Sequence, residues 1–432
     1  MKISKRLLPP LAGWLLWAGS VQAASLAEIY RLALDNDPQL KAAQATYQAD
    51  AEALPQARAG LLPTLSLSAN SSYRDSDFSV LSEGNSNGYS LSLSQPVFRA
   101  QNWFTFKQGQ LLSRQAETEF GKAQQDLIVR TLEAYLDVLQ AQTNLTTAQA
   151  EEKAIKRRLD QVQAQFEVGL IAITDVQEAQ AAYDNSLVNR ILAEGALDNS
   201  FESLERLTDQ SYDRIDALAG AYPIEPLQPD QRQPWLEKAD SDNLELRIVR
   251  LQTDAAEQST KASHAGHYPT LDLTANYSVE NNATFEGDSS QIGLTLNLPL
   301  FSGGLTSSRY RESQQRWYAS RESQEDTLRK VQQDTRSLFR DLRTDRATVK
   351  ARQQAIKSSE TALEATAAGF EVGTRNVVDV LQAERQLFST QRDYATARYE
   401  YVRDLFRFKQ AVGTLNPEDI NQLDRWMTSE TF

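Results

Sequence analysis

The chain has 432 residues, a formal net charge of -13, no cysteine and only two histidines. The missing cysteines exclude disulfides and thiolate metal sites, and two histidines without a third ligand make a weak metal site, so we expect no metal or cofactor. The acidic balance argues against a nucleic-acid partner, because neutralising phosphates requires a basic face. No GxSxG, P-loop or GxGxxG pattern occurs, so we do not expect an enzyme.

The first 23 residues are predicted to be an export signal. A basic start precedes an apolar stretch at residues 7–18, and residues 21–23 (VQA) fit a small-x-small cleavage site. We therefore expect the mature chain to begin at Ala24. The alternative is an uncleaved anchor, but the apolar stretch is shorter than the ~20 residues that span a bilayer.

The two halves of the mature sequence resemble each other. Residues 59–65 (AGLLPTL) return as residues 265–271 (AGHYPTL), at an offset of 206 residues. Residues 166–169 (FEVG) return unchanged as residues 370–373, at an offset of 204 residues. Matched blocks in the same order, at nearly constant offsets, indicate a duplicated unit of about 200 residues.

Each half is predicted to contain, in order, a helix, two strands, a long helix, a turn and a second helix. In the first half these elements are expected at residues 26–58 (with a break at 37–38), 64–73, 88–97, 102–166 and 175–207. In the second half they are expected at residues 234–263, 270–279, 291–298, 305–368 and 377–412. The chain is therefore divided into a signal peptide (1–23), a first repeat (24–220), a linker (221–234), a second repeat (235–412) and a C-terminal tail (413–432).

The four predicted strands alternate between an apolar face and a face of small polar residues. In residues 64–73, for example, Leu65 and Leu67 alternate with serines. Each strand is close to the ~9–11 residues that a tilted strand needs to cross a bilayer. A soluble half-buried sheet would alternate in the same way. The polar, acidic loops expected at 74–87 and 280–290, and the scarcity of charges on the polar faces, favour a membrane barrel.

Four strands cannot close a pore by themselves. Open sheet edges inside a bilayer leave unpaired backbone groups, each costing several kcal/mol. Several copies must therefore share one barrel. The long helices at 102–166 and 305–368 would each run about 96 Å at ~1.5 Å per residue, and helices of this length need lateral partners. The alternative is a soluble or surface-attached coiled-coil scaffold, which does not explain strands at matched points in both halves.

Four blocks make the chain resemble the TolC family of outer-membrane efflux proteins. They are residues 62–65 (LPTL), 168–176 (VGLIAITDV), 269–275 (PTLDLTA) and 372–381 (VGTRNVVDVL). Each block is only modestly specific, but together and in this order they are highly specific. The resemblance covers nearly the whole mature chain, and it is nearest to the branch of the family that has no lipid anchor.

This resemblance implies a fold of mixed α and β structure. A homotrimer would close a twelve-stranded transmembrane β-barrel in the cell outer membrane, joined to a very long antiparallel α-helical coiled-coil barrel in the periplasm. It also implies a passive exit duct of a tripartite efflux or type I secretion system, for proteins or small molecules such as drugs. The implied partners are outer-membrane lipid, a periplasmic adaptor (membrane fusion protein) and an inner-membrane ABC transporter or proton-driven pump.

In the family, the two helix-to-helix turns form a closed periplasmic aperture that adaptor contact opens. The gate residues that the resemblance implies here are Thr174, Asp175, Phe370, Arg375, Asp379 and Gln382. The implied adaptor-docking turns contain Val168, Gly169, Leu170, Val372, Gly373 and Thr374. Arg375 is expected to bond a neighbouring helix, and Asp379 to form a ring of charge that attracts cations across the pore.

Two of these positions depart from the pattern of the family. Phe370 stands where a gate of the TolC type has a tyrosine, so the bond of that hydroxyl is missing. Gln382 stands where a second aspartate follows Asp379. We therefore expect a gate that is held less firmly and blocks cations more weakly.

Simpler interpretations of the charged and polar positions remain open. Thr174 and Asp175 could serve only as the N-cap of a helix, and Arg375 could be a solvated turn charge. Asp272, on the polar face of a predicted strand, could attract cations in a barrel lumen or be part of an ordinary polar lining.

Overall fold

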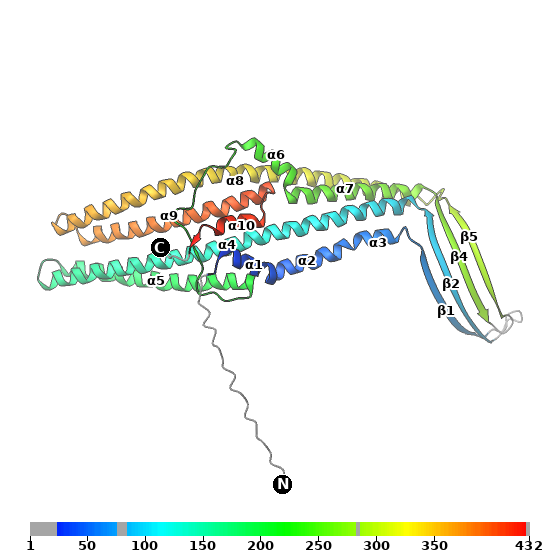
Figure 1. Cartoon of the computed structure of the whole chain (residues 1–432), viewed down its shortest axis with the longest axis horizontal. Coiled ribbons are helices and arrows are strands. Elements are labelled where there is room, and N and C mark those ends of the chain that lie inside the picture. The colour runs from blue at the N-terminus through cyan, green and yellow to red at the C-terminus, as the bar shows by residue number, and fades with distance from the viewer. Residues whose placement is uncertain (1–23, 76–83, 282–285, 429–432) are drawn as a thin grey trace, which may run out of the picture.

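A computed structural model describes residues 24–75, 84–281 and 286–428, so the predicted export signal lies outside the described residues. The molecule is elongated, with its helices along the long axis and a four-stranded sheet at one end (Figure 1). Within the described residues, no helix combines the length and the apolarity that crossing a membrane would require.

Two very long helices form the frame of the molecule. They are α4 (Ala100–Glu167) and α8 (Leu305–Glu371), with 68 and 67 residues, so each is about 100 Å long at ~1.5 Å per residue. The helices α5 (Ile173–Thr208) and α9 (Val377–Val412) turn back along the half of α4 and α8 farther from the sheet. We refer to α4–α5 as the first hairpin and to α8–α9 as the second hairpin.

Shorter helices cover the half of α4 and α8 that is nearer the sheet. The predicted helix at 26–58 is three helices: α1 (Leu26–Asn36), α2 (Pro38–Ala51) and α3 (Ala53–Ala59), of which all three contact α4. The prediction of one continuous helix at 234–263 is wrong, because this segment forms two helices, α6 (Arg232–Asp242) and α7 (Leu244–His264). Asn243 between them caps α7, since its side chain accepts a hydrogen bond from Leu246 N at 2.9 Å.

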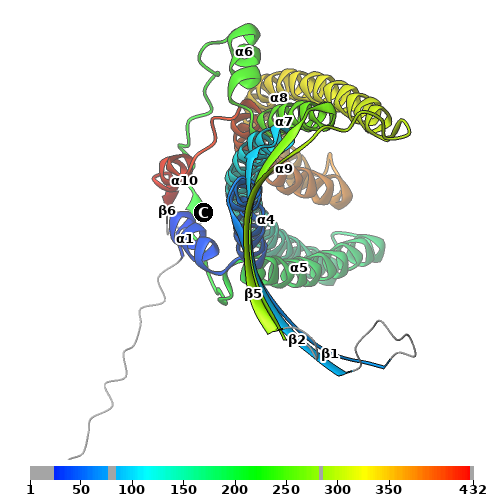
Figure 2. The same ribbon diagram turned by 90° about the vertical axis from the view of Figure 1, so that its right-hand side faces the viewer.

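The sheet joins the two halves of the chain. Its strands are β1 (Thr64–Arg74), β2 (Gly84–Phe98), β4 (Thr270–Asn281) and β5 (Glu286–Asn297), in the antiparallel order β1-β2-β4-β5. The central pair is therefore one strand from each half. In Figure 2 the four strands bend together in one direction.

The expected loops at 74–87 and 280–290 are too long. Pairing continues into them, because β2 already begins at Gly84 and β5 at Glu286. The added residues are polar, so the alternation of apolar side chains ends before the backbone ladder does. Asn87, for example, still pairs with Ser71, whose hydroxyl donates to its side-chain carbonyl at 2.6 Å.

The core lies at mid-length, where the linker and the tail fold onto the long helices. The tail contributes α10 (Pro417–Asp424) and β6 (Met427–Thr428), and β6 pairs with β3 (Ala217–Leu218) at the end of the first repeat. Figure 2 shows α1 and α10 on the opposite side of α4 from the tips of the two hairpins. The buried apolar residues here include Ile29, Leu132, Leu136, Phe406 and Ile420. The tail is thus part of the central packing, although its sequence shows weak periodicity.

Candidate gate and membrane surface

The two predicted turns lie at the end of the molecule farthest from the sheet (Figure 1). Gly169 and Gly373 have φ angles of +78° and +76°, in the left-handed region that glycine adopts without strain. Each turn is closed by one equivalent bond: Leu170 N donates to Gln165 O, and Thr374 N to Gly369 O, both at 2.9 Å. The duplicated sequence therefore folds into the same turn twice.

Apolar side chains project from both turns. Val168, Leu170 and Val372 are 70%, 73% and 74% exposed. Large apolar side chains gathered at an exposed tip are a common property of contact surfaces between proteins. The two turns are therefore chemically suited to dock a partner, as their resemblance implies.

Asp175 and Asp379 occupy equivalent places in the first turn of α5 and α9. Their carboxylates accept hydrogen bonds from Ala172 N at 3.4 Å and from Asn376 N at 3.3 Å. The predicted N-cap role of Thr174 is wrong, because α5 begins at Ile173 and Thr174 lies inside the helix. Asp175 does contribute to capping, but from the third helical position rather than from the cap itself.

Arg375 does not reach another hairpin within the chain. Its guanidinium lies 3.8 Å from the carboxylate of Asp379, four residues later in the first turn of α9, and its side chain is 60% exposed. The aliphatic part covers Gly369, where an added Cβ would lie 2.8 Å from Arg375 Cγ. An exposed pair of this kind contributes only ~0–1 kcal/mol, so a gating role for Arg375 requires a contact with another subunit, which stays a prediction.

Phe370 lies in the apolar layer just above the turns. Its ring packs against a cluster formed by the buried residues Ile155, Leu159, Val162, Ala179, Ala182, Val377 and Leu381. The guanidinium of Arg158 lies 5.8 Å from the ring centroid. Gln382 lies farther along α9 at a shallow cavity of 290 Å³ between α5 and α9. The structure thus brings Phe370 to the contact between the hairpins, whereas Arg375 remains at the tip.

Two of the ion pairs that join the hairpins lie near the tips and were not predicted from the sequence. Arg158 pairs with Glu384 at 3.0 Å, and Arg392 pairs with Glu151 at 3.2 Å. The partners are more than 200 residues apart, and helices with many charged residues carry no local signal for such pairing. Only the antiparallel contact of α4 and α9 brings them together.

At the other end, the sheet exposes a large apolar face. Leu65, Leu67, Ile292, Leu294 and Leu296 are each between 66% and 75% exposed. A soluble monomer rarely exposes a contiguous apolar surface of this kind. This face is therefore chemically suited to contact lipid.

On the opposite face of the sheet, small polar side chains of neighbouring strands form hydrogen bonds with one another. Ser68 bonds Ser90 at 2.8 Å, and Ser278 bonds Ser289 at 2.9 Å. At the base of this face, Asp272 accepts two bonds from the guanidinium of Arg99, at 2.7 and 2.8 Å. The suggestion that Asp272 attracts cations is therefore weakened, because Arg99 neutralises its charge.

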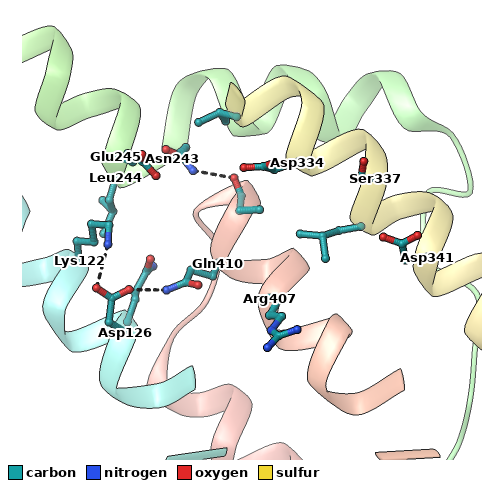
Figure 3. Close-up of a pocket in the computed structure, with 14 residues that line it drawn as sticks. Lys122, Asp126, Asn243, Leu244, Glu245, Asp334, Ser337, Asp341, Arg407 and Gln410 are labelled. Atoms are coloured by element: carbon teal, nitrogen blue, oxygen red, sulfur yellow. Dashed lines mark hydrogen bonds and ion pairs between the residues drawn. The ribbon is translucent and has the colours of Figure 1, made fainter. Parts of the chain in front are cut away.

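The remaining candidates for chemistry have structural explanations. His264 packs against His267, Tyr268 and Tyr310, and the described chain contains no group of three or more His, Cys, Asp or Glu residues arranged to hold a metal. A cavity of 410 Å³ lies where α4, α7, α8 and α9 meet (Figure 3). In the wall of this cavity, the carboxylate of Asp126 forms an ion pair with Lys122 at 2.9 Å and accepts a hydrogen bond from the side chain of Gln410 at 2.7 Å.

The family described as "Outer membrane efflux protein" matches residues 29–210 and 235–414. The chain belongs to the outer membrane efflux protein family. Two curated members are similar to it. The outer membrane protein TolC of Vibrio cholerae is 35% identical, covering 96% of this chain and 97% of its own. The alkaline protease secretion protein AprF of Pseudomonas aeruginosa is 30% identical, covering 92% and 86%.

Solved structures of this family share the fold. A crystal structure of CusC, described in terms of transmembrane channel formation, superposes with a TM-score of 0.81 at 16% identity, covering 90% of this chain and 92% of that one. As a member of the outer membrane efflux protein family, the chain is an outer-membrane channel protein of an efflux or type I secretion system, with its helices in the periplasm.

Proposed function

We propose that three copies of this chain form one passive exit duct. Each would supply four strands to a twelve-stranded outer-membrane barrel, and two helical hairpins to a periplasmic tunnel. The observation that carries this proposal is the sheet: its apolar face is exposed, and β1 and β5 are edge strands of the described chain. Because unpaired strand edges are costly in lipid, neighbouring copies must pair with them. The number three rests on the resemblance to the family.

The duct would carry proteins or small molecules such as drugs without using energy itself. An inner-membrane ABC transporter or proton-driven pump would supply the energy, through a periplasmic adaptor docked on the turns at 168–170 and 372–374. The exposed Val168, Leu170 and Val372 support this docking, because they offer an apolar surface at the tip. The name of AprF refers to protease secretion, which supports a protein cargo. A soluble coiled-coil scaffold would leave the apolar face of the sheet unexplained.

The tips of the hairpins would form the gate. Three copies of Asp379 and of Asp175 would gather acidic charge around the aperture, while Arg375 would bond a neighbouring subunit. Phe370 offers no hydroxyl to the opposite hairpin and is held by apolar packing instead. Gln382 contributes no charge. This gate would hold the aperture closed with fewer polar bonds than one of the TolC type.

Single-channel recording tests both the duct and its gate. The full chain, assembled and inserted into planar lipid bilayers, is expected to form pores of low resting conductance. Arg375→Ser should raise that conductance, because it removes the expected contact between subunits. Arg329→Ser is the matched control, since Arg329 also pairs with a carboxylate four residues away but lies far from the turns. Equal conductance of the two variants would remove Arg375 from the gate, and failure of the wild type to form pores would contradict the duct.

A further inference from the structure

Two ion pairs connect the first hairpin to the second near the tip. Arg158 of α4 lies 3.0 Å from Glu384 of α9, with side chains that are 14% and 9% exposed. Glu151 of α4 lies 3.2 Å from Arg392 of α9, with side chains that are 7% and 33% exposed. Both pairs are largely removed from water, unlike most ion pairs on the surface of the long helices.

The polarity of the two pairs alternates. The long helix α4 supplies the anion Glu151 and, two turns closer to the tip, the cation Arg158, whereas α9 supplies Arg392 and Glu384 in the complementary order. Because the helices are antiparallel, a slide of α9 by two turns toward the tip would place Arg392 opposite Arg158. A slide in the other direction would place Glu384 opposite Glu151. Either shift would bring like charges together in a partly dry contact, which strongly disfavours it.

The ion pair nearer the tip, Arg158–Glu384, also contacts Phe370 in the apolar cluster just above the turns. The guanidinium of Arg158 lies 5.8 Å from the ring of Phe370, which leads into the turn of the second hairpin. One end of Arg158 therefore contacts α9 and its flat face contacts the end of α8. No local feature of the turns themselves makes an equivalent polar bond between hairpins in the described chain.

We propose that the Arg158–Glu384 ion pair holds the second hairpin in register against the first within each subunit, and thereby keeps the gate closed. The Glu151–Arg392 pair fixes the same register two turns farther from the tip. This inference rests on the proposed function of the chain as a gated duct. It assigns the holding role to side chains on the helix faces rather than to the turns.

The Arg158–Glu384 pair specifies the register of the two hairpins rather than adding to the free energy of folding. Burial raises the pKa of Glu384 even though Arg158 lowers it, so removal from water outweighs the attraction. Within the described chain, Glu384 Oε2 and Arg158 Nε also have no hydrogen-bond partner. Loss of one partner would therefore leave a buried charge uncompensated and force the hairpins apart, whereas replacing both by apolar residues would keep them together.

We expect a specific order among variants in single-channel recordings of the assembled full chain. Arg158→Ala and Glu384→Ala should each raise the ratio of open to closed channels about tenfold, which corresponds to about 1.4 kcal/mol. The double variant Arg158→Leu/Glu384→Leu should stay near the wild-type ratio. The reversed pair Arg158→Glu/Glu384→Arg should also return toward the wild type, because it restores opposite charges.

Arg190→Ala is the matched control. Arg190 pairs with Glu152 at 2.7 Å, with side chains that are 25% and 19% exposed, and both residues belong to the first hairpin. Breaking this pair removes an ion pair of the same kind without uncoupling the two hairpins. The open-to-closed ratio should therefore remain that of the wild type.

Three results would overturn the inference while leaving the duct intact. They are single variants that form wild-type channels, an Arg190→Ala channel that opens as readily as Glu384→Ala, and a reversed pair that assembles normally but opens like the single variants. Should the alanine variants fail to assemble, Glu384→Gln replaces them, because it keeps the shape of the side chain and removes only the charge. A wild-type chain that forms no channel would instead contradict the proposed function itself.

Discussion

Asp37 and Asn243 hold equivalent positions in the two halves of the chain. Each stands between two helices, and each caps the second with its side chain: Asp37 accepts from Leu40 N at 3.0 Å, and Asn243 from Leu246 N at 2.9 Å. Both are buried, and both bond an opposite helix, Asp37 through Arg130 at 2.6 Å and Asn243 through the carbonyl of Ala411 at 2.8 Å. A single polar residue thus interrupts each covering helix and anchors the break.

The protonation of Asp345 is expected to make the stability of the fold depend on pH. Burial and the nearby carboxylates of Asp404, Asp341 and Glu400 raise its pKa to about 6. The folded state therefore binds a proton between pH 4 and 6 that the unfolded state releases, so this group lowers the stability as the pH rises through that range. We expect Asp345→Asn to raise the unfolding temperature of the assembled protein at pH 7 and to leave it nearly unchanged at pH 4.

The measurement for Asp345 is thermal unfolding in detergent between pH 4 and 8. Glu360→Gln serves as the control, because Glu360 is an exposed carboxylate on the same helix. An Asp345→Asn variant whose unfolding temperature shifts equally at both pH values would show that the effect is not linked to this proton.

Among the contacts between elements, α3 lies close against α4 at Gly109. A Cβ added at Gly109 would lie 2.7 Å from Ala57 Cβ and 2.9 Å from Ala53 O. Alanine favours a helix over glycine by about 1 kcal/mol, so overlap and helix propensity oppose each other at this position. Because the close atoms include backbone, we expect overlap to win and Gly109→Ala to destabilise the fold by about 1–3 kcal/mol.

Gly121 supplies the comparison in the same helix. An added Cβ there would lie 3.9 Å from its nearest neighbour, a side-chain carbon of Leu244. Gly121→Ala should therefore stabilise the protein by up to about 1 kcal/mol. Urea unfolding of both variants measures the difference, and a gain of stability in Gly109→Ala would show that α3 is free to move away from α4.

At the scale of the whole molecule, the proposed assembly turns the exposed apolar face of the sheet toward lipid. Leu67 is 71% exposed on this face. Leu67→Arg should therefore destabilise the inserted barrel by ~2–4 kcal/mol if the residue lies near the middle of the bilayer. Ser66→Arg, its neighbour on the polar face, should cost much less, because a charge in a water-filled lumen stays hydrated.

Folding of both variants into lipid vesicles, followed by urea titration, gives the two free energies. Similar losses for Leu67→Arg and Ser66→Arg would mean that the two faces of the sheet do not meet different solvents. In that case the shared barrel, and with it the requirement for several copies, would no longer be supported.

Features that depend on short-range patterns could be predicted from the amino-acid sequence alone. The alternation in residues 64–73 marks β1, the glycines at 169 and 373 mark two equivalent turns, and the long polar stretches without proline mark α4 and α8. The repeated blocks also indicated which family the chain belongs to. Each of these signals is contained within one short stretch of sequence, which is why it can be recognised without knowledge of the fold.

Features that depend on residues distant in the chain became visible only in the folded structure. In the fold, Arg158 forms an ion pair with Glu384, and Arg99 forms one with Asp272. The weakly patterned tail packs into the core through Ile420. Strands β2 and β5 also extend beyond their apolar alternation, because backbone pairing with a neighbouring strand continues where side-chain patterning has ended. The physical reason is the same in each case: these contacts form only when segments far apart in the sequence are brought side by side.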